Sequence, residues 1–334
     1  MNTPNLLIKR SIKSIASIAK ARVGFPSLDS GSVNVLAYHR VVADIAKAET
    51  EAFYGLSVSS ETFRRHCAML KKAYDVVSLE TAMYFLSGER RVKRPLAVIT
   101  FDDGYLDFYE EAFPILNEFG LPATNFLPTD CIGQDKPLAH DRIYWLLKQA
   151  FERKISIENV LKKAGIAPTK NRLKLTEAFV YLQHDLREKV IAELESELGE
   201  FAEYPREYQL LNWEQVREMS RKGINFGGHT ANHVVLTLEN ETEMEAEIFA
   251  SKKELEKQLN GEITTFAYPN GEYNAKIRQI IANAGYKVAV TTEKRINRQG
   301  ADLLSLGRIS LCEESTRGIG GVYSPKVAAL RLSI

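Results

Sequence analysis

Short apolar runs alternate with amphipathic stretches along most of the chain. Nearly continuous apolar runs predict buried strands at 33–42, 75–79, 95–101, 122–128, 224–228, 264–269 and 286–291. Apolar positions three and four residues apart predict helices at 59–74, 107–120, 212–223, 241–261 and 274–285. Gly120 suits the end of the second helix, and Asn212 with Gln215 has the spacing of a capping box at the start of the third. Strands and helices that alternate in this way predict a mostly parallel sheet.

The alternation stops between about 135 and 210. Three charged, helix-like stretches follow one another there, and no convincing strand lies among them. We interpret this region as a helical insertion in an α/β fold. The remaining β/α units are compatible with an open doubly wound sheet or with a closed barrel. The sequence contains neither of the glycine-rich loops that hold phosphates in nucleotide-binding folds.

Charge and cysteine content exclude several functional classes. The chain of 334 residues has 44 Lys and Arg against 43 Asp and Glu, so its net charge of +1 gives no reason to expect a nucleic acid partner. Its three cysteines are widely spaced, which indicates neither a disulfide framework nor a zinc knuckle. Any functional charge is therefore local.

Residues 1–30 form a basic leader. Ile8, Ile12 and Ile15 fall on one helical face and lysines lie elsewhere, as in an amphipathic helix. The segment is too interrupted to span a bilayer, which requires about 20 mostly apolar residues. A membrane-surface anchor, a helix packed on the protein body and a signal peptide remain as alternatives. We expect a cytoplasmic location, at the inner membrane surface if the leader is an anchor.

Two groups of polar residues follow predicted strands. Asp102 and Asp103 come directly after one strand, and His229 and His233 follow another at a spacing of four. Carboxyl ends of parallel strands meet at one edge of the fold, where active sites are built. If the second segment is helical, both imidazoles lie on one face. One Asp with two His would leave open positions on a bound ion, as in catalytic zinc sites.

Four motifs carry a family resemblance. "TFDDGY" (100–105) and "HTANH" (229–233) resemble the first two motifs of the NodB-type polysaccharide deacetylases, which are metal-dependent enzymes that remove acetyl groups from N-acetylated sugars. "FAYPNGEYN" (266–274) is similar to the third motif of that family. "VLAYHRV" (35–41) resembles the start of its exopolysaccharide-type members.

The resemblance implies a fold, a cofactor and residue roles. The implied fold is a distorted (β/α) barrel over 31–334, interrupted by the insertion at about 135–210. Asp103, His229 and His233 would bind one divalent metal ion, for which zinc is favoured, and Asp102 would act as general base. The backbone N–H of Tyr105 would stabilise the oxyanion. Three residues after the predicted strand at 264–269, namely Tyr268, Pro269 and Asn270, would form one wall of the substrate groove.

The sequence departs from the family pattern at two places. Ala267 stands where the third motif usually has an arginine, and no histidine follows His233 to serve as the usual general acid. Three groups are candidates to protonate the leaving amine: His39, the His140-Asp141 pair, and Asp102 itself. We place His39 at the barrel mouth, where a substrate contact is as well supported as acid catalysis.

The expected function is de-N-acetylation of an amino sugar in a cell-surface glycan or its lipid-linked precursor. The partners implied are an N-acetylated glycan or lipid-linked sugar and, through the leader, the membrane surface. One alternative is a catalytically silent barrel that binds glycan or a biosynthetic partner, which the two departures would explain. Another is a deacylase of a non-sugar amide, because one fold can support several reactions.

Overall fold

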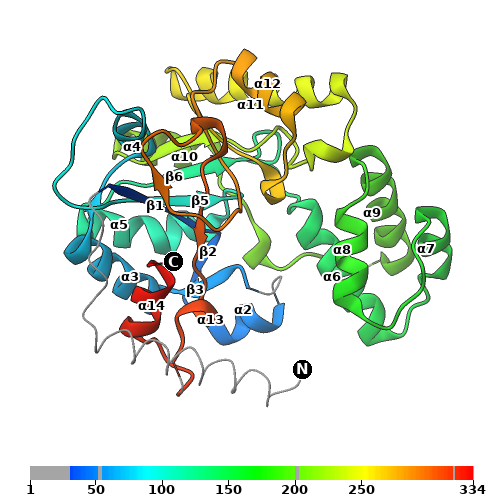
Figure 1. The fold of residues 1–334 in the computed structure, drawn as a ribbon. Helices are drawn as coiled ribbons and strands as arrows, with labels where there is room; N and C mark the ends of the chain where they lie inside the picture. The colour runs from blue at the N-terminus through cyan, green and yellow to red at the C-terminus, as the bar shows by residue number, and fades with distance from the viewer. Residues whose placement is uncertain (1–30, 52–54, 200–202, 319, 334) are drawn as a thin grey trace.

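A computed structural model describes residues 31–51, 55–199, 203–318 and 320–333 (Figure 1). The predicted leader at 1–30 lies outside the described residues. No helix within the described ranges has the length and apolar character needed to cross a membrane.

A nine-stranded sheet forms the centre of the molecule. Its strands lie in the order β10-β1-β5-β6-β7-β8-β9, with β11 beside β1 and β4 beside β5. All of these pairs are parallel except β10 with β1. The bounds are β1 Ser32–Tyr38, β4 Asp75–Val76, β5 Leu96–Asp102, β6 Thr124–Leu127, β7 Asn225–Gly228, β8 Thr265–Ala267, β9 Val288–Val290, β10 Asn297–Arg298 and β11 Ile309–Ser310. Two further strands, β2 Arg40–Val42 and β3 Ser57–Ser59, pair separately.

One short segment connects the two ends of this sheet. Leu306 forms a parallel bridge with Val290 of β9, and three residues later Ile309 pairs with Leu36 of β1. Residues 306–310 therefore lie between the last and the first strands of the parallel run. The sheet curls into the distorted (β/α) barrel that the motifs implied, and the open doubly wound alternative is wrong.

Helices cover the outside of the curled sheet. Those of the barrel are α2 Ile45–Glu51, α3 Ser60–Ala73, α4 Leu79–Leu86, η1 Phe108–Ala112, α5 Phe113–Phe119, α10 Trp213–Arg221, α11 Glu241–Leu259, α12 Ala275–Asn283, α13 Glu313–Thr316 and α14 Pro325–Arg331. Short 3-10 turns occupy η3 Arg206–Tyr208, η4 Leu236–Leu238, η5 Pro269–Gly271 and η6 Leu303–Ser305. Two predicted ends are confirmed: Asn212 and Gln215 form a capping box, and Gly120 ends α5 in the left-handed conformation. The predicted helix at 107–120 begins with a π-helical turn, η1.

Four helices stand apart from the barrel between β6 and β7. They are α6 Ala139–Arg153, α7 Glu158–Ala164, α8 Arg172–Val180 and α9 His184–Leu198, drawn in green in Figure 1. Their apolar side chains, among them Leu147, Phe179 and Ile191, form a buried cluster separate from those of the barrel. This helical insertion is therefore packed around its own core.

Candidate active site

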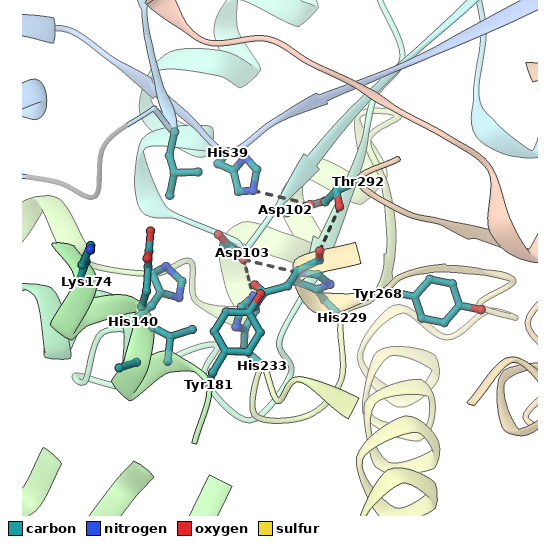
Figure 2. Close-up of a pocket in the computed structure, with 15 residues that line it drawn as sticks. His39, Asp102, Asp103, His140, Lys174, Tyr181, His229, His233, Tyr268 and Thr292 are labelled. Carbon is teal, nitrogen blue, oxygen red and sulfur yellow. Dashed lines mark hydrogen bonds and ion pairs between the residues drawn. The ribbon is translucent and has the colours of Figure 1, made fainter. Parts of the chain in front are cut away.

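The chain turns at the carboxyl ends of β1, β5, β7 and β8 meet around one pocket (Figure 2). Its volume is about 920 Å³. The barrel contributes His39, Asp102, Asp103, His229, His233, Tyr268 and Asn270 to the lining, and the insertion contributes His140, Lys174, Glu177 and Tyr181. Parallel α/β folds place their active sites at this edge because the loops there are free to vary.

The turn after β5 separates the two adjacent carboxylates. Asp102 is the last residue of the strand, and Asp103 follows with a positive φ of 78°, which is uncommon for a residue other than glycine. Gly104 also has a positive φ, of 67°, and a Cβ there would lie 2.8 Å from the Leu127 side chain. A side chain at position 104 would therefore disturb the turn. The backbone of this turn directs the Asp102 side chain toward an arginine, Arg308, and the Asp103 side chain toward two histidines, His229 and His233.

The side chains of Asp103, His229 and His233 have the geometry of a metal-binding site. One ligand atom from each lies within 4.8 Å of the others. Asp103 Oδ1 is 3.1 Å from His233 Nε2 and 3.5 Å from His229 Nε2, yet it is buried without a hydrogen bond. The Ala267 carbonyl, 2.7 Å from His229 Nδ1, can only accept, so Nδ1 carries the proton and Nε2 presents a lone pair in neutral His229.

These donors fit a divalent cation. Two imidazole nitrogens and one carboxylate oxygen converge at a buried point, and a cation there would offset the cost of burying an unpaired carboxylate. Burial works against ionised Asp103, but its interactions with His233 and His229 outweigh burial and hold the pKa of Asp103 well below its usual value. The carboxylate is therefore ready to act as a ligand. Burial lowers the pKa of His233 to about 4, which favours the neutral, ligating imidazole.

A tight turn brings the two imidazoles together. The helical alternative for residues 229–233 is wrong, because Thr230 and His233 have positive φ values of 64° and 53°. The ring centroids of His229 and His233 are 4.8 Å apart. Glu247 of α11 accepts hydrogen bonds from the backbone N–H groups of Ala231 and Asn232 at 2.9 and 2.8 Å, so this turn is fastened to the outer helix layer.

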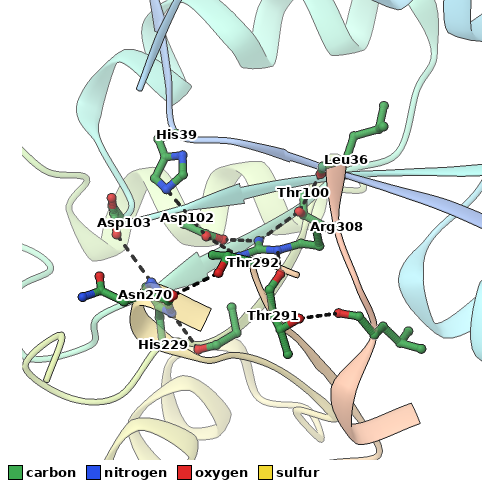
Figure 3. Close-up of polar contacts among 12 residues, drawn as sticks. Leu36, His39, Thr100, Asp102, Asp103, His229, Asn270, Thr291, Thr292 and Arg308 are labelled. Carbon is green, nitrogen blue, oxygen red and sulfur yellow. Dashed lines mark hydrogen bonds and ion pairs between the residues drawn. The ribbon is translucent and has the colours of Figure 1, made fainter. Parts of the chain in front are cut away.

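Arg308 holds Asp102 through a buried two-point ion pair (Figure 3). Arg308 Nη1 and Nη2 each lie 2.7 Å from an oxygen of Asp102, and Nε donates to the Thr291 carbonyl at 2.9 Å. Burial works to raise the pKa of Asp102, but the charge and hydrogen bonds of Arg308 outweigh burial and lower it. Asp102 is therefore ionised. Arg308 was not among the residues predicted from the sequence, although Ala267 at the usual arginine position was a signal that an arginine could come from elsewhere in the chain.

His39 lies beside Asp102 in the pocket. Its Nε2 is 3.8 Å from Asp102 Oδ2, and 24% of its side chain is exposed. Burial lowers the pKa of His39, and the carboxylates of Asp103 and Asp102 oppose that shift. A histidine in contact with both the pocket and the ionised carboxylate has the position of a proton carrier.

Tyr105 has its side chain turned away from the pocket. The phenol is buried and its hydroxyl donates to Asp141 Oδ2 at 2.7 Å, and His140 Nε2 lies 2.9 Å from the Tyr105 hydroxyl oxygen. Only the backbone N–H of Tyr105 is left for the predicted oxyanion contact. The structure thus places the His140-Asp141 pair partly in a structural network, although His140 also lines the pocket.

The three predicted groove residues after β8 differ in their surroundings. Asn270 lines the pocket and has a positive φ of 55°. Tyr268 also touches the pocket, but its hydroxyl donates to the Leu304 carbonyl at 2.9 Å. Pro269 is buried and is not among the lining residues. The pocket instead gains Lys174, Glu177 and Tyr181 of the insertion, for which the sequence carried no motif.

Comparison with known proteins gives consistent matches. A family model described as polysaccharide deacetylase matches residues 89–289, which is more than half of the 334 residues. A Bacillus subtilis protein named YxkH, provisionally called a polysaccharide deacetylase, is 22% identical over 269 residues, covering 80% of this chain and 70% of its own. The poly-beta-1,6-N-acetyl-D-glucosamine N-deacetylase of Staphylococcus epidermidis is 27% identical over 191 residues, covering 51% of this chain and 60% of its own.

Solved structures share the fold. IcaB from Ammonifex degensii superposes with a TM-score of 0.59 at 18% identity, covering 92% of this chain and all of that one. The Streptococcus pyogenes deacetylase PplD, solved in complex with acetate, gives 0.58 at 24% identity and covers 88% of this chain and 99% of its own. Because the family match includes Asp102, Asp103 and both histidines, the chain belongs to the polysaccharide deacetylase family and is a hydrolase acting on amide C–N bonds.

Proposed function

We propose that this protein is a metal-dependent hydrolase that removes an N-acetyl group from an amino sugar of a cell-surface polysaccharide or its lipid-linked precursor. One observation carries the proposal: Asp103, His229 and His233 converge beside the arginine-paired Asp102 in a large pocket. The name of the S. epidermidis relative, a poly-N-acetylglucosamine N-deacetylase, supports the substrate class.

Asp103, His229 and His233 would hold the ion. Amide hydrolysis is slow because the carbonyl is a poor electrophile and neutral water is a poor nucleophile. A divalent cation bound there would polarise the carbonyl and lower the pKa of water. Zinc is the ion we expect, since two imidazoles and a carboxylate with open positions form a zinc-type catalytic set.

Asp102 would accept the proton of the attacking water. Its pKa below the usual range keeps it ionised, and the two hydrogen bonds from Arg308 fix the plane of its carboxylate. Arg308 thus acts on the reaction through Asp102 and is a positioning residue. The Tyr105 N–H would donate to the oxyanion that forms as the water adds.

His39 would pass on to the leaving amine the proton that Asp102 takes from the water, since its lowered pKa leaves the resting imidazole neutral. An amine cannot depart as an anion, so the reaction requires a proton donor near the scissile nitrogen. His39 Nε2 borders the pocket 3.8 Å from Asp102, whereas His140 Nε2 is engaged with the Tyr105 hydroxyl. Together, Arg308 and His39 provide groups for the two family roles that Ala267 and the missing late histidine left unfilled, which favours an active enzyme over a silent barrel.

The basic leader supports a membrane-surface location for the proposed reaction. Ile and Lys positions in residues 1–30 suit contact with an anionic membrane surface. A lipid-linked sugar at the inner membrane face would then be the substrate form that the protein meets.

The test combines metal content with product analysis. Elemental analysis of the purified protein should find about one zinc-like ion per chain, and His229→Ala should lose it. The zinc-loaded wild type should release acetate and a free amine from N-acetylglucosamine oligomers, and Asp103→Ala should not. Normal turnover by a metal-free Asp103→Ala protein would sink the proposal. Acetate release from a simple non-sugar acetamide, with none from the oligomers, would instead favour the non-sugar deacylase.

A further inference from the structure

One face of helix α8 borders the same pocket as the metal-binding residues. The residues Glu177, Ala178 and Tyr181 lie three, four and seven positions after Lys174, so the four share one side of the helix and of its C-cap, and all four line the pocket. On its other side, Phe179 is buried in the core of the insertion. The position of this face is therefore fixed by the packing of the insertion.

Tyr181 is an exposed aromatic ring held in place at this face. Its side chain is 47% exposed, although large apolar side chains usually become buried. Its hydroxyl donates to Glu272 Oε1 at 2.8 Å, and Glu272 Oε2 accepts from Thr237 at 2.8 Å. The barrel thus anchors the tip of the ring. An anchored ring loses little conformational freedom when a ligand packs against it.

The charges at this face suit a neutral polyhydroxyl ligand. Lys174 and Glu177 are exposed, and neither side chain has a hydrogen bond or ion pair among the described residues. The positive and the negative side chain lie about one helical turn apart, so they provide a hydrogen-bond donor and an acceptor without a net charge. An anionic or cationic polymer would meet one repulsive group there.

The size of the pocket indicates room for more than the acetylated sugar. Its volume of about 920 Å³ lies near the top of the range of roughly 300–1,000 Å³ for pockets that hold drug-sized ligands. A single acetamido sugar is smaller than such ligands. The part of the pocket bordered by the insertion is therefore free for a neighbouring unit.

We propose that the insertion provides a second sugar subsite, in which Tyr181 packs against a sugar ring next to the unit being deacetylated and Lys174 and Glu177 bind its hydroxyl groups. The C–H groups on one face of a pyranose pack well on the electron-rich face of a phenol ring. The inference rests on the proposed function for the identity of the glycan. It makes Tyr181 a residue that selects chain length.

The test measures binding and turnover separately on the full chain. The probes are a β-linked N-acetylglucosamine pentamer and the free monomer, titrated by calorimetry and assayed for acetate release. Tyr181→Ala should weaken pentamer binding and raise its KM about tenfold while leaving the monomer unaffected, because about 1.4 kcal/mol corresponds to one stacked ring. Tyr181→Phe keeps the ring and should stay within about threefold of wild type.

A matched control is available on the same insertion. Phe151 of α6 is also an exposed ring, at 38%, but is not part of the pocket lining, so Phe151→Ala should leave pentamer binding unchanged. Pentamer turnover and binding by Tyr181→Ala equal to wild type would overturn the subsite and leave the deacetylase proposal standing. Tyr181-dependent pentamer binding without any acetate release would support the subsite and reject the deacetylase proposal. No pentamer binding by wild type would overturn the subsite.

Discussion

Asp102 and Asp103 occupy two different electrostatic environments despite being neighbours in the chain. The Asp102 carboxylate faces a guanidinium, and that of Asp103 faces two imidazoles. Both are buried, so each needs a nearby positive group to remain ionised. The left-handed backbone at Asp103 and Gly104 is what allows successive side chains to reach these separate partners. Local backbone strain therefore coincides with the point at which the two carboxylates separate.

Acid catalysis by His39 can be distinguished from a structural role by changing the leaving group. His39→Gln should lower kcat for an N-acetylated sugar by about a hundredfold or more, because the amine needs a proton to depart. Hydrolysis of 4-nitrophenyl acetate should change little, since its phenolate leaves unprotonated. Steady-state assays on both substrates check this. An equal loss on the amide and the ester would instead indicate that His39 maintains the site structure.

Arg308 should matter for stability as well as for chemistry. Arg308→Met leaves the Asp102 charge buried and unpaired, which should cost about 3–5 kcal/mol in the free energy of unfolding. Arg278→Met is the matched control, because Arg278 makes a similar two-point pair with Asp302 at the surface, where such pairs contribute about 1 kcal/mol or less. Urea unfolding measures both. Equal losses in the two variants would contradict the assigned burial effect, and Asp102→Asn should restore part of the stability of Arg308→Met.

At the scale of elements, long patterned segments were predictable and short ones were not. Apolar positions, capping residues and glycines were sufficient to define four elements, namely the strands β5 and β7 and the helices α3 and α11. The two strand-end motifs could therefore be placed on one edge of the fold. β11 has two residues and its pairing depends on β1, more than 270 positions earlier in the chain. Local pattern contains no information about such a contact.

The site residues that were not predicted are those whose positions depend on such long-range contacts. Arg308 precedes β11 on the segment that connects β9 with β1, and Tyr181 follows a helix whose orientation depends on the core of the insertion. Both positions are set by tertiary packing. The convergence of Asp103, His229 and His233 could be predicted because their residue types and their strand-end positions are both visible in the sequence.

The turn that carries the histidines should depend on α11 through Glu247. Glu247→Ala removes the acceptor of two backbone N–H groups at Ala231 and Asn232, so His233 should be less well placed. We expect metal affinity about tenfold weaker, measured by competition with a chromophoric chelator. Glu245→Ala changes an exposed residue of the same helix and should retain the wild-type affinity. Equal affinities for the two variants would mean that the turn holds its shape without Glu247.

On the scale of the whole molecule, the two ends of the described chain meet around His66 of α3. Tyr38 of β1 lies 3.2 Å from His66 Nδ1, and Thr316 of α13 lies 3.2 Å from Nε2. His66 is fully buried. It therefore links β1 to α13 through one side chain, and its protonation state bears on the stability of the entire barrel.

His66 should make the barrel less stable as the pH falls. Burial lowers the pKa of folded His66 from 6.5 to about 3, so below pH 6.5 the unfolded chain binds a proton that the folded protein excludes. The unfolding free energy attributable to His66 is complete above pH 6.5 and decreases down to about pH 3, by about 2 kcal/mol between pH 7 and pH 5. Urea unfolding across this range should show His66→Gln losing that part of the slope. His184→Gln, which leaves the buried imidazole in place, should keep it. An unchanged slope in His66→Gln would mean that other groups control acid unfolding, and that the junction of the chain ends tolerates a charged imidazole.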